Sequence, residues 1–120
     1  MPASPLEADV SGGPEGARIA LRGQIDRDAD AAMADAYTRA VAHGPGAIEL
    51  DFSEVGYINS TGIALIVRIL ADARRDHREV RARGLTEHYR EIFRITRLAD
   101  FMTMVDEAPA ATAGGEGGSR

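Results

Sequence analysis

The sequence predicts an α/β fold, in which a mixed, largely parallel sheet of four to five strands carries three to four helices. Three observations lead to this prediction. Apolar segments with the two-residue period of strands alternate along the chain with segments of helical period. The 120 residues are enough for one domain that buries its own core. The chain has no cysteine, so this core has to form without disulfides or thiolate metal sites.

Two strands are expected near the amino terminus. A short one at residues 6–10 and a clearer one at residues 17–21 are separated by the turn-forming sequence SGGPEG at residues 11–16. In the second strand, Ile19 and Leu21 alternate with small or charged residues, which indicates that one face is covered.

The first helix is expected between residue 26 and the sequence GPG at residues 44–46, which stops it. Met33, Tyr37 and Val41 recur at helical spacing within this segment. Three aspartates crowd its start, where the helix dipole favours negative charge.

The middle of the chain predicts a strand and a second helix. The strand is expected at residues 47–52, where AIELDF places alternate apolar residues on one face. The sequence SEVG at residues 53–56 is expected to turn, and residues 57–58 form a second short apolar piece. A helix should follow at residues 61–75, and its first half is apolar nearly all round, which predicts burial on several sides.

The last part of the chain predicts a strand, a helix and an edge strand. The sequence EVRAR at residues 79–83 reads as a short strand, and Thr86 can cap a helix that runs to residue 98. Residues 101–105 could form a final edge strand. The third helix should direct three side chains inward: Tyr89, Ile92 and Phe93.

We expect one domain at residues 6–106, between a flexible amino terminus at residues 1–5 and a disordered tail at residues 107–120. The tail has no large apolar residue. The longest apolar run is too short for a membrane span and is interrupted by Arg68, and the amino terminus lacks the basic and apolar blocks of a signal peptide. The corresponding prediction is a cytoplasmic protein.

The charges argue against a nucleic-acid-binding protein. All fourteen basic residues are arginine and the net charge is −5, whereas nucleic-acid binders present a basic face. One stretch is nevertheless basic, and it could either complement the end of a helix or contact an acidic partner or phosphate groups. Its members are Arg68, Arg74, Arg75, Arg78, Arg81 and Arg83.

The sequence Asn59-Ser60-Thr61-Gly62 lies where a buried strand should end and a helix should begin. Any of its three polar side chains could accept a hydrogen bond from the first helical turn, so a helix cap explains one of them. The alternative is a modification site, because a phosphate on Ser60 would meet the positive end of the helix. It would also add about −1.5 to −2 charges to a neutral surface. A partner bound there would be released by repulsion and desolvation, without refolding of the domain.

An enzymatic function finds little support in the sequence. A serine hydrolase would place Ser60 in the pattern Gly-x-Ser-x-Gly, but Ile58 occupies the first glycine position and only Gly62 fits. His77 and His88 lie among helix-end charges, which favours solvated surface residues over members of a catalytic triad. Metal-ligand spacings and a glycine-rich phosphate loop are absent from the sequence. We therefore expect no enzyme, no metal and no cofactor.

The segment DFSEVGYINSTGIALIV, residues 51–67, resembles the signature of the STAS domain family, which includes bacterial anti-sigma factor antagonists. LRGQID at residues 21–26 and RGLTEHYREIFRITRLADFM at residues 83–102 are similar to two further segments of that family. The likeness covers about residues 6–105. It implies a STAS-like fold without catalytic activity.

The resemblance also implies partners. In such antagonists the serine that matches Ser60 is phosphorylated by a partner that is both a serine kinase and an anti-sigma factor. The unphosphorylated antagonist binds this partner and frees the sigma factor; phosphorylation breaks the complex, and a metal-dependent serine phosphatase restores it. Thr61 falls on the second hydroxyl position and is the second candidate for phosphorylation. The partner-binding residues expected from this likeness are Asp26, Asp51, Ser53, Asn59, Ser60, Thr61, Gly62 and Ile63.

Asn59 departs from the family, which usually has aspartate at this position. The segment therefore keeps its capping ability but lacks a negative charge beside Ser60. Some family members work without phosphorylation, as scaffolds of stress-signalling assemblies or as accessory subunits of lipid transporters. In that alternative Ser60 is only a cap, and an exposed helix face binds the partner. A weak homodimer is a further alternative, and an enzyme with Ser60 as nucleophile is the third hypothesis.

Overall fold

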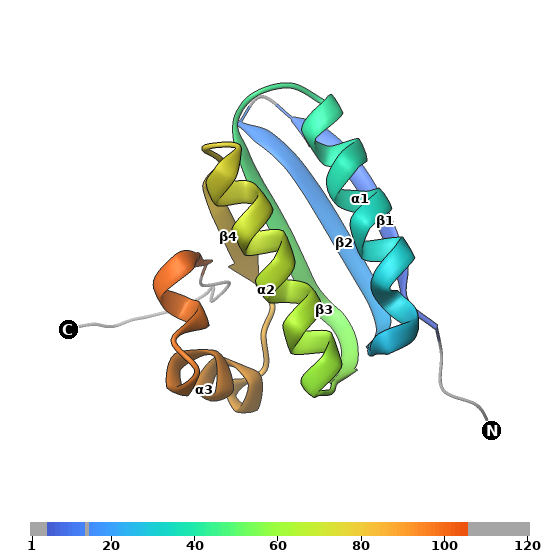
Figure 1. The fold of residues 1–120 in the computed structure, drawn as a ribbon, viewed down its shortest axis with the longest axis vertical. Helices are drawn as coiled ribbons and strands as arrows, with labels where there is room; N and C mark the ends of the chain where they lie inside the picture. Colours follow the sequence, from blue (N-terminus) through green and yellow to red (C-terminus); the bar gives the residue numbers. More distant parts are fainter. Residues whose placement is uncertain (1–4, 14, 106–120) are drawn as a thin grey trace, which may run out of the picture.

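Five strands form one sheet in the computed structural model, which describes residues 5–13 and 15–105. Strand β1 is antiparallel to β2, and all other neighbours are parallel, which confirms the predicted mixed, largely parallel sheet (Figure 1). The expected disordered tail lies outside the described residues, as does the expected flexible amino terminus apart from Pro5. In sheet order the strands are β1 (Glu7–Gly13), β2 (Gly16–Ile25), β3 (Ala47–Ile58), β4 (Val80–Arg83) and β5 (Thr103–Val105).

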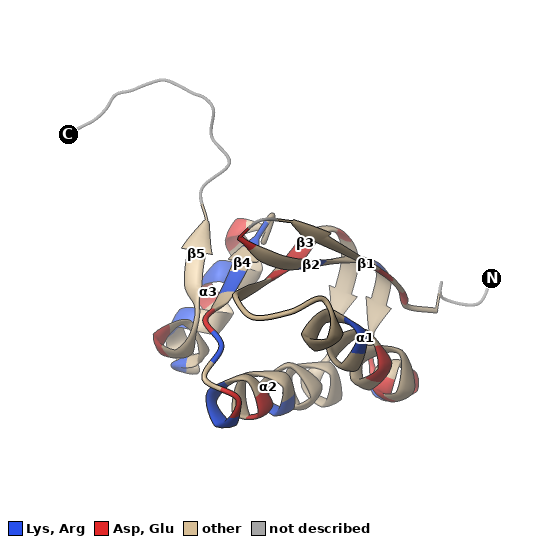
Figure 2. Cartoon of the chain, turned by 90° about the horizontal axis from the view of Figure 1, so that it is seen from above, with Lys and Arg blue, Asp and Glu red and all other residues tan. Residues whose placement is uncertain are grey.

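Three α-helices accompany the sheet, in agreement with the sequence. Helices α1 and α2 lie side by side on the same face of the sheet (Figure 2). Helix α3 lies at the same end of the molecule as the start of α2 (Figure 1). The helices are α1 (Asp30–Ala42), α2 (Ser60–Arg75) and α3 (Glu87–Ile95), with single 3₁₀ turns at η1 (Arg27–Ala29) and η2 (Leu98–Phe101).

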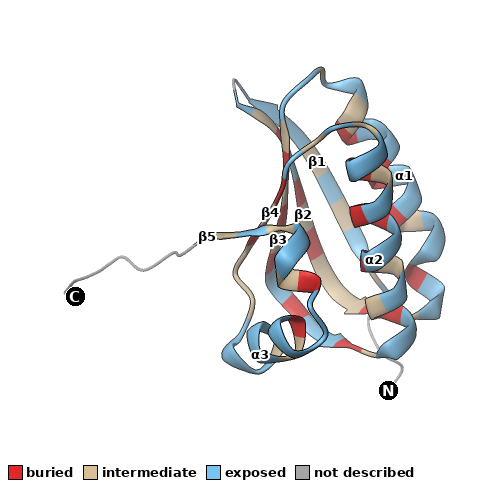
Figure 3. Cartoon of the chain, turned by 60° about the vertical axis from the view of Figure 1, so that its left-hand side comes forward, coloured by how far each residue is buried: buried red, intermediate tan, exposed pale blue. Residues whose placement is uncertain are grey.

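The core lies between the sheet and the helices (Figure 3). Strand β2 alternates as expected, because Ile19 and Leu21 are buried while Arg18 faces solvent. Helix α3 contributes Phe93, which is fully buried and meets the Phe52 ring edge to face, with the ring centroids 6.0 Å apart.

The predicted turn at residues 53–56 is wrong, because β3 continues through these residues as one strand of 12 residues. Two register shifts against β2 each place an extra residue in β3. These bulges let Phe52, Val55 and Ile58 all face the core, although they are three residues apart rather than two. A three-residue spacing matches neither strand nor helix, and this is why the segment resembled a turn.

Other boundaries also differ from those predicted. Strand β1 extends through the glycines to Gly13, and α3 ends at Ile95 because Arg97 adopts a left-handed conformation with a φ of 70°. The first half of α2 is not buried on several sides. Its side chain Ile66 is buried, but Val67 is 44% exposed.

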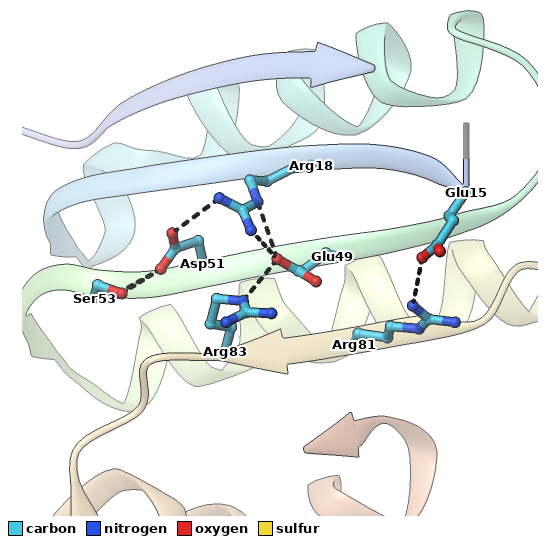
Figure 4. A network of polar contacts seen from close by, with 7 residues as sticks. All are labelled: Glu15, Arg18, Glu49, Asp51, Ser53, Arg81 and Arg83. Carbon is cyan, nitrogen blue, oxygen red and sulfur yellow. Dashed lines mark hydrogen bonds and ion pairs between the residues drawn. The ribbon is translucent and has the colours of Figure 1, made fainter. Parts of the chain in front are cut away.

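The face of the sheet opposite α1 and α2 carries a network of charged side chains (Figure 4). Arg18 Nε donates to Glu49 at 3.0 Å, and Arg83 reaches the same carboxylate oxygen at 3.0 Å. Such lateral ion pairs join neighbouring strands and favour this register. The charge alternates from strand to strand, with Glu7 and Asp9 on β1, Arg18 and Arg22 on β2, Glu49 and Asp51 on β3, and Arg81 and Arg83 on β4.

Candidate functional site

The segment from Asn59 to Gly62 lies where β3 ends and α2 begins. Asn59 is the cap of α2, because its side-chain oxygen accepts a hydrogen bond from the Gly62 N–H at 2.8 Å. Ser60 and Thr61 are exposed, and neither caps the helix. Capping therefore explains Asn59 and leaves the two hydroxyl groups available to other molecules.

The segment is held against the end of strand β2. The Asn59 N–H donates to the Ile25 carbonyl at 3.2 Å. Gly62 is buried, and a Cβ atom at this position would lie only 1.9 Å from the same carbonyl oxygen. A glycine is thus required for the close approach between α2 and β2 that fixes the place of Ser60.

A contact that the sequence did not predict comes from α3. The Ile58 N–H donates to the Tyr89 hydroxyl oxygen at 2.9 Å. Helical spacing predicted that Tyr89 points inward, but not what its hydroxyl meets. The hydroxyl can accept this hydrogen bond because β3 continues to Ile58. The sequence did not predict this length, because the two bulges interrupt the alternating pattern of the strand.

The structure brings together only part of the predicted partner-binding set. Asp26 follows Ile25 directly and caps η1, with the Asp28 N–H donating to it at 3.0 Å, so it lies at the end of β2 that holds the segment. Asp51 and Ser53 lie elsewhere. They are in the middle of β3, where Asp51 is seven residues and Ser53 five residues before its end, roughly 23 and 17 Å along an extended strand.

Asp51 and Ser53 belong to the charged face of the sheet. The backbone N–H of Ser53 donates to Asp51 at 3.0 Å, and its hydroxyl bonds the same carboxylate (Figure 4). Arg18 approaches the other oxygen of Asp51 at 3.9 Å. Both side chains thus contribute to the ion-paired sheet surface, on the face away from α2.

One side of α2 is exposed along much of its length. Ser60, Ala64, Val67 and Ala71 recur at intervals of three and four residues, so they form one line on the helix, which we call the docking face. Its largest apolar member, Val67, is 44% exposed. Arg68 flanks the docking face, and its ion pair with Asp30 is long, at 3.8 Å.

The basic stretch does not form one surface. Arg81 and Arg83 lie on the charged face of the sheet, whereas Arg74 and Arg75 end α2. Arg78 donates to the carbonyls that end α1 and precede β3, those of Val41 and Gly46. This distribution favours the first of the two alternatives, in which these arginines serve the fold locally.

The geometry offers no catalytic arrangement around Ser60. Within residues 5–13 and 15–105, Ser60 makes no hydrogen bond to a histidine or a carboxylate. His77 lies beyond the opposite end of α2, about 24 Å away along 16 helical residues. His88 packs its ring on the neighbouring Tyr89, with centroids 4.9 Å apart. The described part of the chain also contains no group of three acidic or histidine side chains that could hold a metal ion.

Comparison with known families gives one match. The profile described as "Mlab, STAS domain" matches residues 8–106, which include every described strand except the first residue of β1. No curated protein matches the sequence significantly. Of the helices in the described ranges, none is both long and apolar enough to cross a membrane.

Solved structures share the fold at low identity. The anti-sigma factor antagonist SpoIIAA in its unphosphorylated form superimposes with a TM-score of 0.65 and 15% identity, over 85% of this chain and 90% of that one. An anti-sigma factor antagonist from Mycobacterium paratuberculosis gives a TM-score of 0.66 and 22% identity, over 88% and 86%. The Bacillus cell fate determinant SpoIIAA in the phosphorylated form gives 0.63 and 17%, over 84% and 93%.

Proposed function

The chain belongs to the STAS domain family, and we propose that it acts as an anti-sigma factor antagonist that is switched by phosphorylation of Ser60. The unphosphorylated protein binds a partner that is both a serine kinase and an anti-sigma factor. The phosphorylated protein releases it, and a serine phosphatase reverses the modification. The observation that carries this proposal is the exposed Ser60 hydroxyl, which starts the docking face and has no part in capping α2.

Ser60 suits a phosphate in the folded protein. Transfer of the γ-phosphoryl group of ATP to its Oγ releases ADP and a proton. The new group sits in the first turn of α2, where the helix dipole and the free N–H groups favour negative charge. Asn59 is neutral, so no carboxylate at the capping position repels the phosphate. The fold is therefore expected to tolerate the modification.

The same phosphate opposes binding on the docking face. Ala64 and Val67 follow Ser60 by four and seven residues, so they lie on the same side of α2. A partner that covers them would have to desolvate about −1.5 to −2 charges at the edge of an apolar contact. Thr61 points about 100° around the helix from Ser60, so it is the second candidate.

A second candidate function needs no phosphate. The matching profile carries the name Mlab, and the docking face has an apolar centre at Val67 that could bind a constitutive partner. In that case the protein is a scaffold or accessory subunit of a stress-signalling assembly or a lipid transporter. Substitution Val67→Asp is expected to abolish partner binding under either function, because it places a charge at the centre of the contact.

Capture from a lysate of the source cells separates the two candidates. The bait proteins are wild type, Ser60→Glu and the matched control Ser11→Glu, which adds the same charge at an exposed serine of β1 outside the partner-binding set. The captured proteins are incubated with ATP and identified by mass spectrometry. The switch predicts an ATP-binding kinase on wild type and Ser11→Glu, phosphate on Ser60, and no capture by Ser60→Glu. Equal capture of one assembly or transporter ATPase by all three baits, without phosphate on Ser60, would establish the second function instead.

A further inference from the structure

Strand β3 extends well beyond its neighbour β4. The last paired residue of β4, Arg83, lies opposite Asp51, and β3 continues from there to Ile58. Among the described residues, no strand pairs with this side of β3 beyond Asp51, and α3 contacts it there instead. The Tyr89 hydroxyl of α3 accepts a hydrogen bond from the Ile58 N–H at 2.9 Å, and this bond is half-buried.

Helix α3 is itself fixed to the same strand. Phe93 is fully buried against Phe52 of β3, and it follows Tyr89 by four residues, on the same face of α3. At its start the helix is capped by the Thr86 hydroxyl, which accepts the Tyr89 N–H at 3.3 Å. Tyr89 is thus a rigid support for the end of β3.

Three hydrogen bonds fix the segment that presents Ser60, in addition to the first backbone hydrogen bond of α2, from the Ile63 N–H to the Asn59 carbonyl. Ile58 donates to Tyr89, Asn59 donates to the Ile25 carbonyl, and Gly62 donates to the Asn59 side chain. They come from α3, from β2 and from the segment itself. Of the residues that accept these bonds, Tyr89 lies on α3, which is later in the chain. Its hydrogen bond therefore couples the position of α3 to the start of α2.

We infer that Tyr89 is a positioning residue for Ser60: through the Ile58 amide it holds the end of β3 so that the Ser60 hydroxyl is presented in one orientation. The inference rests on the proposed function in taking Ser60 as the modified residue. Loss of the Tyr89 hydroxyl opens the segment locally while the core stays folded, because Phe93 still anchors α3. Phosphorylation of Ser60 then slows, since the acceptor is no longer preorganised.

The chain supplies a matched control. Tyr89→Phe removes the hydroxyl that accepts a hydrogen bond from the Ile58 N–H, next to the segment. Tyr37→Phe removes a hydroxyl that donates a hydrogen bond to Asp76 at 2.7 Å, at the far end of α2. Amide hydrogen exchange is measured by NMR on both variants and on wild type, with the stability of each determined by urea denaturation. We expect Ile58, Asn59 and Gly62 to exchange about tenfold faster in Tyr89→Phe only, since one hydrogen bond is lost there.

A second measurement connects this local opening to Ser60. The kinase recovered with wild-type bait phosphorylates each variant, and the initial rate at Ser60 is followed by mass spectrometry. The expected result is a slower reaction for Tyr89→Phe only, whereas Tyr37→Phe, which also loses one hydrogen bond, should react at the wild-type rate. Unchanged exchange at Ile58–Gly62, exchange accelerated equally throughout the protein, or an unaltered phosphorylation rate would each overturn the positioning role.

The exchange measurement needs no partner, so it separates this inference from the proposed function. If exchange accelerates at Ile58–Gly62 but no kinase modifies Ser60, the phosphorylation switch fails while the hold of Tyr89 on the segment is supported.

Discussion

Gly62→Ala is the substitution whose effect follows most directly from the geometry of the site. Ala is the better helix former by about 1 kcal/mol, so helix propensity alone predicts a more stable protein. The structure predicts the opposite. The new Cβ would lie 1.9 Å from the Ile25 carbonyl oxygen and 2.7 Å from its carbon, both backbone atoms of a buried strand end.

The magnitude can be worked from this contact. To bring the separation to at least 3.0 Å, the first turn of α2 and β2 must part by about 1.1 Å. Forcing an extra methyl group into a packed site costs about 1–3 kcal/mol. The movement also breaks the Asn59–Ile25 hydrogen bond of 3.2 Å, worth about 1 kcal/mol. After the gain in propensity is subtracted, Gly62→Ala should lower the free energy of unfolding by about 1–3 kcal/mol.

Urea denaturation of wild type, Gly62→Ala and Gly56→Ala tests this reasoning. At Gly56, in β3, an added Cβ would meet nothing within 4 Å, so that variant should be neutral or more stable by about 0.4–1 kcal/mol. Gly62→Ala at wild-type stability or above would show that α2 shifts without cost. The claim that this glycine fixes the place of Ser60 would then be lost.

Two other predictions concern the cap and the pH dependence of stability. Asn59→Ala should cost about 1 kcal/mol in urea denaturation because it removes the cap, whereas Ser60→Ala should stay within about 0.5 kcal/mol; the reverse order would make Ser60 the structural residue. Hydrogen bonds from Arg75, and then from the Tyr37 hydroxyl, lower the pKa of Asp76 below its usual value. Its contribution to stability is therefore fully present above the unfolded-state pKa of about 4 and is lost as the pH falls through the lower, folded-state pKa. Urea denaturation at pH 7 and at pH 3 should show a smaller difference for Asp76→Asn than for wild type, and an equal difference would contradict the assignment.

The sequence predicts those parts of the fold in which buried residues recur at the regular spacing of a strand or a helix. Ile48 and Leu50 alternate with solvent-facing residues, and β3 begins where expected. The second half of this strand could not be predicted, because its two bulges arise from pairing with β2, which is distant in sequence. For the same reason the sequence does not predict the hydrogen bond from Ile58 to Tyr89, because Ile58 belongs to the sheet only when β3 is continuous.

The site was predictable in its position but not in the roles of its residues. Asn59, Ser60 and Thr61 are all good capping residues, so the sequence alone leaves the choice open. In the structure, Asn59 has the extended conformation of a cap, with a φ of −98° and a ψ of −176°, and it bonds Gly62. Asp51 is the opposite case: its motif suggests proximity to the site, but the continuous strand places it on the charged face of the sheet.

This division of roles at the start of α2 has a physical consequence for a switch. A residue that both capped the helix and accepted a phosphate would change the stability of the domain each time it was modified. Under the proposed function, Asn59 would keep the cap in both states, because the Gly62 N–H donates to Asn59 and not to Ser60, and Gly62 would keep the helix against β2. A phosphate on Ser60 would therefore change the free energy of binding at the docking face without removing the cap that stabilises the start of α2. Such a separation is what a module needs if a kinase and a phosphatase are to cycle it between bound and released states without unfolding it.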